Sequence, residues 1–209
     1  MPVTETAFLN KPKNLQLEAG ILYEKLDDAS KNFSLPAITI HYSLNDRFEL
    51  FLSNSFNFNI DDEASNNNFP LTLGLKTPII KKENTTFSIA TYAIGNIEKD
   101  KKITVNPSAY LLFSHQFNSK ILVEANFGQE YDFFGNNFIS YYSTVITSAS
   151  HPKLHPFIEI YGNFSIEDHP HHHLNAGLIY AFNNKIQIIG SSGCGLNSNS
   201  AKYFAYIGV

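Results

Sequence analysis

Several charged and hydroxylated residues occupy the polar positions of segments in which apolar and polar side chains alternate. In an extended strand, residues two apart share a face, so these positions all point to one side of the wall that the strands form. If that wall closes on itself, its polar side becomes an inner surface. The residues that we expect to line this lumen are Glu18, Glu49, Lys76, Tyr92, Tyr110, Glu124, Glu159 and Tyr161.

Three interpretations of this lumen set are considered. Carboxylates gathered in a constriction would favour cations or polar solutes, because rings of charged side chains set the selectivity of a pore. Alternatively, the same residues hydrogen-bond one another and fill a narrow barrel, since a wall of about twelve strands lies between filled eight-stranded barrels and open porins. A hydrolytic pair of carboxylates is a third option, but no spacing in the sequence singles out two of them.

Four histidines form the densest group of potential metal ligands, in the sequence His-Pro-His-His-His. Imidazoles so close together could bind zinc or copper. Pro170 and the preceding Glu167-Asp168 indicate a loop, however, and a loop does not impose a tetrahedral arrangement. We therefore predict no physiological metal centre and no cofactor. The weak candidates for metal ligands are His169, His171, His172 and His173.

The motifs of the common enzyme classes are missing from the sequence. It has no Gly-x-Ser-x-Gly elbow, phosphate loop or dinucleotide-binding fingerprint. The glycine-rich run 190–195 is not followed by a helical pattern and is typical of a strand end. A single cysteine, Cys194, excludes an internal disulfide, and the scattered lysines and arginines do not form the basic face that nucleic acid requires. We predict neither enzymatic activity nor nucleic-acid binding.

The elements that would position the lumen residues are about twelve short segments between residue 15 and the C-terminus. The clearest are 103–117 and 120–130, which alternate long enough to reach the ~9–11 residues that a membrane strand needs. In the first, Leu112 interrupts the polar face, and Pro107 predicts a bulge or a missing ladder bond. Residues 1–13 show no alternation and are expected to form a tail or lead-in to a single barrel domain spanning 14–209.

The connections between these segments predict two different rims. Tight turns are expected at 45–46, 82–83, 118–119, 151–152 and 183–184. Wider polar connections alternate with them near 27–32, 61–68, 96–102, 131–136, 167–171 and 197–201. One rim with short turns and one rim with longer loops are typical of barrels in the bacterial outer membrane, where the turns face the periplasm and the longer loops face outside.

Composition is compatible with a wall that faces lipid. Only 16% of the residues are charged, against about a quarter in a typical soluble domain, and the chain holds 18 phenylalanines and 11 tyrosines. The mean hydropathy of −0.16 does not oppose this, because half of each barrel strand is polar and points inward. Residues 1–5 lack the pattern of a signal peptide, so we expect that a signal has been removed.

The segment Leu15-Gln16-Leu17-Glu18-Ala19-Gly20, followed by Tyr23-Glu24, is similar to the opening strand of a family of bacterial outer-membrane barrels. This family is associated with the meta pathway of phenol degradation. Its penultimate hairpin and closing glycine-rich strands are matched by 175–180 with 183–187, by 193–196 and by 203–209. The resemblance implies an outer-membrane location and passage of small apolar or aromatic compounds, and it implies no catalytic residues.

The sequence thus predicts an all-β fold, a single up-and-down antiparallel transmembrane barrel of about twelve strands, surrounded by outer-membrane lipid. The first functional hypothesis is a channel or facilitator for the passive passage of small molecules, gated by the long outside loops. One alternative is a non-transporting structural or interaction barrel with a filled lumen. Another is a water-soluble, lipocalin-like binder. No pattern points to a particular oligomeric state.

Overall fold

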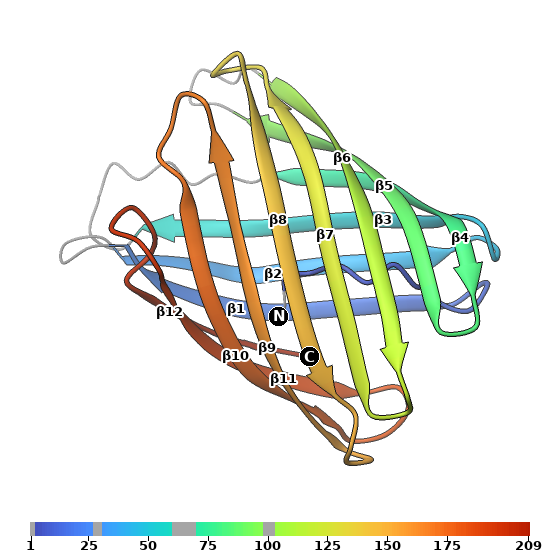
Figure 1. Ribbon diagram of the computed structural model, residues 1–209. Helices are drawn as coiled ribbons and strands as arrows, with labels where there is room; N and C mark the ends of the chain where they lie inside the picture. Colours follow the sequence, from blue (N-terminus) through green and yellow to red (C-terminus); the bar gives the residue numbers. More distant parts are fainter. Residues whose placement is uncertain (1–2, 27–30, 60–69, 98–102) are drawn as a thin grey trace.

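The structure, a computed structural model, describes residues 3–26, 31–59, 70–97 and 103–209, and over these residues twelve strands close into one antiparallel barrel (Figure 1). Each strand pairs with its neighbours in sequence, and the first pairs with the last. The strands are β1 (Leu15–Lys25), β2 (Lys31–Ser43), β3 (Glu49–Asn59), β4 (Leu71–Lys82), β5 (Thr85–Ile97), β6 (Ile103–Phe117), β7 (Ile121–Asp132), β8 (Asn137–Ser148), β9 (Leu154–Ser165), β10 (His171–Ala181), β11 (Gln187–Gly195) and β12 (Tyr203–Gly208). The predicted fold class and strand number are confirmed. Within the described ranges, no helix is long and apolar enough to cross a membrane.

Large apolar side chains cover the outer face of the wall. Leu17, Leu73 and Leu111 are each more than half exposed. Soluble proteins rarely expose so much contiguous apolar surface to water. The same outer face carries Leu50, Leu52, Val105, Phe127, Ile146, Ile158, Leu178 and Ile207, all exposed. A belt of this kind around a closed wall suits hydrocarbon tails, and it argues against the water-soluble alternative.

The tight turns predicted from the sequence are confirmed, and so are three of the six wider connections. Among the described connections, those of the wider rim are only slightly longer than the tight turns. One end of the barrel, here named the short-turn rim, carries the connections 44–48, 83–84, 118–120, 149–153 and 182–186. The opposite rim carries 133–136, 166–170 and 196–202, and the expected wide connections near 27–32, 61–68 and 96–102 fall largely outside the described residues. The 133–136 connection is short because β7 and β8 extend to the pair Asp132 and Asn137.

Pro107 interrupts the barrel ladder without a bulge. Its register against β5 is unbroken, and it pairs with Ala93. On its other side, the pairing of β6 with β7 begins only at Ser108, so the missing N–H of the proline falls beyond the end of that ladder. Of the two outcomes predicted for Pro107, the bulge is not observed; instead the ladder between β6 and β7 ends beside the proline. Pro78 shows the other solution, because it lies at a register shift of β4 against β5.

Tyrosine rings on the inner face lie over glycines of neighbouring strands. The ring of Tyr92 on β5 covers Gly74 on β4, so that a Cβ atom at Gly74 would overlap it. At the seam where β1 meets β12, Tyr206 covers Gly20 in the same way. Glycine at these positions therefore lets an aromatic ring approach the backbone of the next strand.

The Gly74→Ala substitution is expected to destabilise the barrel by about 1–3 kcal/mol, the usual cost of overpacking. The Tyr92 ring is held between Phe51 and Tyr110, with ring centroids 5.2 and 5.6 Å away, and cannot move aside freely. Gly190→Ala is the matched control, because a Cβ atom there meets no atom within 4 Å. Urea unfolding in lipid vesicles, followed by circular dichroism, measures both. Equal effects of the two substitutions would contradict the overlap argument.

Candidate functional site

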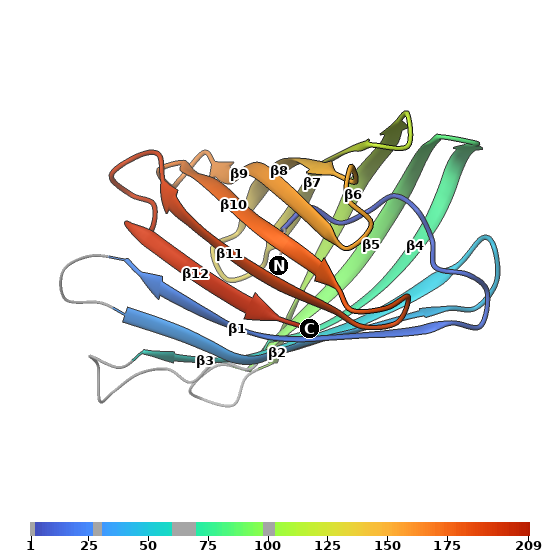
Figure 2. The ribbon, with the colours of Figure 1, turned by 90° about the horizontal axis from the view of Figure 1, so that it is seen from below.

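The N-terminal segment runs inside the barrel before it enters β1. Figure 2 shows it as the dark blue chain that starts within the barrel and turns back into β1 at the end of the barrel where the turn between β2 and β3 lies. Contacts of this segment cross the lumen from β9, which Thr4 reaches, to β3, which Asn10 reaches. We name residues 4–10 the plug. The sequence-based assignment of residues 1–13 to a tail or lead-in contained no indication of this path.

One end of the plug is bound by Glu159 on β9. The backbone N–H and the hydroxyl of Thr4 both donate to Oε1 of Glu159, at 2.7 and 2.8 Å. The other carboxylate oxygen accepts a hydrogen bond of 2.9 Å from the side-chain amide of Asn175 on β10. Glu159 is only 1% exposed, so these donors replace the water that a carboxylate otherwise binds.

The middle of the plug packs against β5 and β6. The N–H of Ala7 donates to Oγ of Ser114, at 2.8 Å, and the carbonyl of Ala7 accepts from Oγ of Ser88, at 2.7 Å. The Ala7 side chain is fully buried, in a small apolar cluster with Ala90 and Leu112. Leu112, the exception in the polar face of its segment, therefore points into the lumen and packs against the plug.

An ion-pair network on β2, β3 and β4 holds two further positions of the plug, Glu5 and Asn10. The ammonium of Lys76 lies 2.9 Å from Oε1 of Glu5 and 2.8 Å from Oε1 of Glu49. Nδ1 of His41 lies 3.4 Å from the same oxygen of Glu49. The second oxygen of Glu49 accepts a hydrogen bond of 2.7 Å from the N–H of Asn10. A carboxylate of the plug and a carboxylate of the wall thus share one ammonium.

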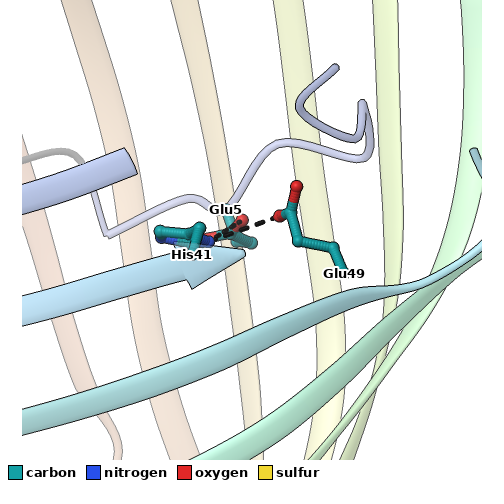
Figure 3. A group of neighbouring side chains, drawn as sticks. All are labelled: Glu5, His41 and Glu49. Atoms are coloured by element: carbon teal, nitrogen blue, oxygen red, sulfur yellow. Dashed lines mark ion pairs between the residues drawn. The ribbon is translucent and has the colours of Figure 1, made fainter. Parts of the chain in front are cut away.

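Glu5, His41 and Glu49 also form the geometry of a potential metal site (Figure 3). One ligand atom from each lies within 4.8 Å of the others. The ammonium of Lys76, however, contacts the same oxygens of both glutamates and already supplies the positive charge that a metal ion would bring. A divalent cation placed there would be repelled by this ammonium. The group is therefore an ion-pair network that fixes the plug.

The structure divides seven of the eight predicted lumen residues into three groups. Glu49, Lys76 and Glu159 contact the plug directly. Glu18 accepts a hydrogen bond of 2.6 Å from the side chain of Gln16, while Glu124 accepts one of 2.9 Å from Ser114. The third group is aromatic. Tyr92 and Tyr110 belong to a row of rings at successive centroid distances of 5.0, 5.2, 5.6 and 6.1 Å, in the order His41, Phe51, Tyr92, Tyr110 and Tyr141.

Tyr161 lies apart from the plug contacts. Its ring stacks on that of His173, with centroids 4.8 Å apart, and lies 6.0 Å from the ring of Phe204. These rings belong to β9, β10 and β12. The structure therefore places Tyr161 in an aromatic group of its own rather than with Glu159, two residues earlier on the same strand.

The histidine cluster is not confined to a loop, as the sequence analysis expected. His171, His172 and His173 are the first residues of β10, where pairing with β9 fixes them. The hydroxyl of Tyr142 lies 2.9 Å from Nδ1 of His172, whereas His173 stacks on Tyr161. Consecutive side chains of a strand point to opposite faces. The imidazoles are therefore divided between the two sides of the wall and do not converge on one ion.

A cavity of about 200 Å³ lies between the plug and the inner wall. Its lining residues come from the parts of β1, β2, β3, β7, β8, β10 and β11 that are closest to the short-turn rim, together with Lys76 of β4. They include two of the predicted lumen carboxylates, Glu18 and Glu124, and neither of them contacts the ammonium of Lys76 within ion-pair distance among the described residues. Sequence reasoning missed the plug and His41. The only signal for the plug was Leu112, an apolar residue on a polar face that needed an apolar partner inside.

Comparison with known proteins places the fold among membrane barrels. No protein-family model and no curated protein matches the chain. The structure of the NanC porin is similar, with a TM-score of 0.68 and 8% identity over 92% of this chain and 97% of that chain. The translocator domain of the autotransporter NalP from Neisseria meningitidis is similar with a TM-score of 0.53 and 10% identity, over 95% of this chain and 88% of that chain. At these identities the similarity is one of fold. Together, the fold and the arrangement of the site define the protein as a porin-like β-barrel with an occupied lumen.

Proposed function

We propose that the protein is a bacterial outer-membrane channel that is closed by its own N-terminal segment and passes small molecules when the plug leaves the lumen. The observation that carries this proposal is the chain of contacts from Glu159 to Glu49, through which residues 4–10 bridge opposite parts of the wall. The apolar outer belt and the likeness to a porin fold support the membrane location. In such a membrane the short-turn rim would face the periplasm.

The contacts of the plug suit reversible closure. Nearly all of them are hydrogen bonds or ion pairs, and a polar contact in a lumen can be exchanged for water with a net loss of only about 0.5–1.5 kcal/mol each. The apolar part of the interface is centred on Ala7, which packs with Ala90 and Leu112 in a cluster that Tyr92 and Tyr110 flank. Phe8 and Leu9 of the plug are partly buried as well. A plug held mainly by polar contacts is bound specifically, and water can replace these contacts when the plug is released.

The solute class is supported by two observations. The resemblance of both chain ends to the family associated with phenol degradation favours small apolar or aromatic compounds. The cavity beside the plug has an apolar wall, to which Leu122, Val145, Ile179 and Ile189 contribute. Passage would be passive, because the proposal needs no energy source beyond a concentration gradient.

The second candidate function is a structural or interaction barrel that transports nothing. The same occlusion favours it, because buried Glu49 and Glu159 are fully engaged by the plug and by neighbouring wall residues. In this case the loops of the rim opposite the short-turn rim would carry the interaction, and the lumen would stay filled.

Planar-bilayer recording of the refolded protein tests the proposal. We expect brief, discrete openings that prefer cations, because the carboxylates outnumber the ammonium groups among the described residues that line the cavity. Glu124→Gln should shift the reversal potential under a salt gradient toward that of an unselective pore. Glu83→Gln, in the exposed turn between β4 and β5, should leave it unchanged. A bilayer that stays silent with folded protein, both full-length and without residues 1–10, would refute the channel and favour the structural barrel.

A further inference from the structure

The cavity beside the plug is lined by two kinds of side chain. Strands β7, β8, β10 and β11 contribute the apolar residues Leu122, Val145, Ile179 and Ile189. Strands β1 to β4 and the plug contribute most of the charged ones. Among the described lining residues, four carboxylates face one ammonium and one imidazole: Glu5, Glu18, Glu49 and Glu124 against Lys76 and His41. The cavity is therefore amphipathic and carries an excess of negative groups.

The negative excess resides in Glu18 and Glu124. The carboxylates of Glu5 and Glu49 share the ammonium of Lys76. Glu18 instead accepts from the neutral amide of Gln16, and Glu124 accepts from the hydroxyls of Ser114 and Thr6. Glu124 is also only 8% exposed. A buried carboxylate has about four acceptor positions, so two neutral hydroxyl donors leave some of them unused, and an ammonium group is the partner that best satisfies these.

We propose that this cavity binds a small organic cation, a primary amine that carries an apolar or aromatic body. Its ammonium group donates to Glu124, and its body packs against the apolar side chains of β10 and β11. The size of the cavity agrees with this class, since an apolar cavity of about 150 Å³ accommodates benzene, and about 200 Å³ leaves room for a short aminoalkyl arm. The inference rests on the proposed function to the extent that it names the solute class of the channel.

The test uses 2-phenylethylamine as the probe, titrated calorimetrically into the refolded full-length protein in detergent micelles. Phenylacetate and 2-phenylethanol carry the same ring with a negative charge and with no charge. The amine is expected to bind at least about tenfold more tightly than either of them, because charge-assisted hydrogen bonds contribute more than neutral ones. Equal affinities for the three compounds, or no binding of the amine, would overturn the proposal.

Two variants of the same strand locate the binding site. Glu124→Gln is expected to weaken binding of the amine by about tenfold or more. Glu130→Gln is the matched control, because Glu130 also projects inward from β7 but accepts hydrogen bonds from Asn106 and Tyr141 outside this cavity. Equal losses in both variants would overturn the proposal. If Glu124→Gln fails to fold, as judged by its mobility on gels with and without heating, Ile189→Phe tests the apolar wall and must also lower the affinity.

The binding experiment and the conductance experiment can refute their proposals independently of each other. Openings of the channel without amine binding would refute the ligand class and leave the plugged channel in place. Amine binding that depends on Glu124 in a protein that never conducts would support the site and refute the channel.

Discussion

A chain that lacks residues 1–10 is expected to form channels that stay open in planar bilayers, whereas channels of the full-length protein open only briefly. The deletion removes every described contact between the plug and Glu159, Ser114, Ser88 and Glu49. If the open state of the full chain lies a few kcal/mol above the closed one, it is populated for about 0.1–10% of the time. The time-averaged current through the shortened protein should therefore rise about tenfold or more, measured at fixed voltage and protein density.

A second variant separates specific binding of the plug from simple filling of the lumen. Replacing residues 4–10 with a glycine-serine sequence of the same length keeps the bulk of chain but removes Glu5 and the packed side chain of Ala7. We expect this variant to conduct nearly as well as the shortened chain. If both variants stay closed while folded, the wall itself closes the lumen, and the plug does not gate it.

Lys76→Met is expected to cause the largest loss of stability of any single substitution discussed for this barrel, about 3–5 kcal/mol. Lys76 is only 4% exposed, and its ammonium lies within 3 Å of Oε1 of both Glu5 and Glu49. Removing one partner of a buried ion pair leaves an uncompensated charge, which costs far more than the pair contributes. Urea unfolding in lipid vesicles, followed by circular dichroism, measures the loss.

The double variant Lys76→Met with Glu49→Gln checks the cause of this loss. It removes the unpaired charge on the wall while keeping a hydrogen-bond acceptor for the N–H of Asn10. Most of the lost stability should return, because replacing both members of a buried pair is often close to neutral. Lys153→Met, on the exposed short-turn rim, is the control for the loss of a lysine and should change little. A double variant no more stable than the single one would contradict the ion-pair explanation.

The barrel wall could be predicted from the sequence because each strand shows its two faces in its own residues. A strand with one face toward lipid and one toward a polar lumen alternates at period two, so 103–117 and 120–130 were recognisable and their faces were assigned correctly. Leu111 and Phe127 point outward, and Glu124 points inward, as the alternation requires. The turns were recognisable for the same reason, since Asn, Asp and Gly favour tight reversals.

The plug could not be predicted, because its contacts join residues far apart in the chain and follow no period. Thr4 binds Glu159, which is 155 positions away, and nothing within residues 1–13 marks that partner. The histidines were misplaced for a related reason. Pro170 correctly indicated a loop, but the pairing with β9 that extends the strand back to His171 is decided by a neighbouring strand. Leu112 carried the one usable signal, an apolar side chain directed toward a supposedly wet interior.

The attachment of the plug to β1 determines how the lumen can be resealed. The chain turns at 11–14, where the N–H of Lys13 donates to the carbonyl of Ser43, and the N–H of Ser43 donates to the carbonyl of Asn14. Because the plug is joined to β1 by only a few residues, its effective concentration at the lumen is in the millimolar range, independent of the amount of protein in the membrane. Diluting the protein therefore does not weaken binding of the plug. A detached peptide with the sequence of residues 1–12 would have to reach about millimolar concentration to silence a shortened barrel equally well.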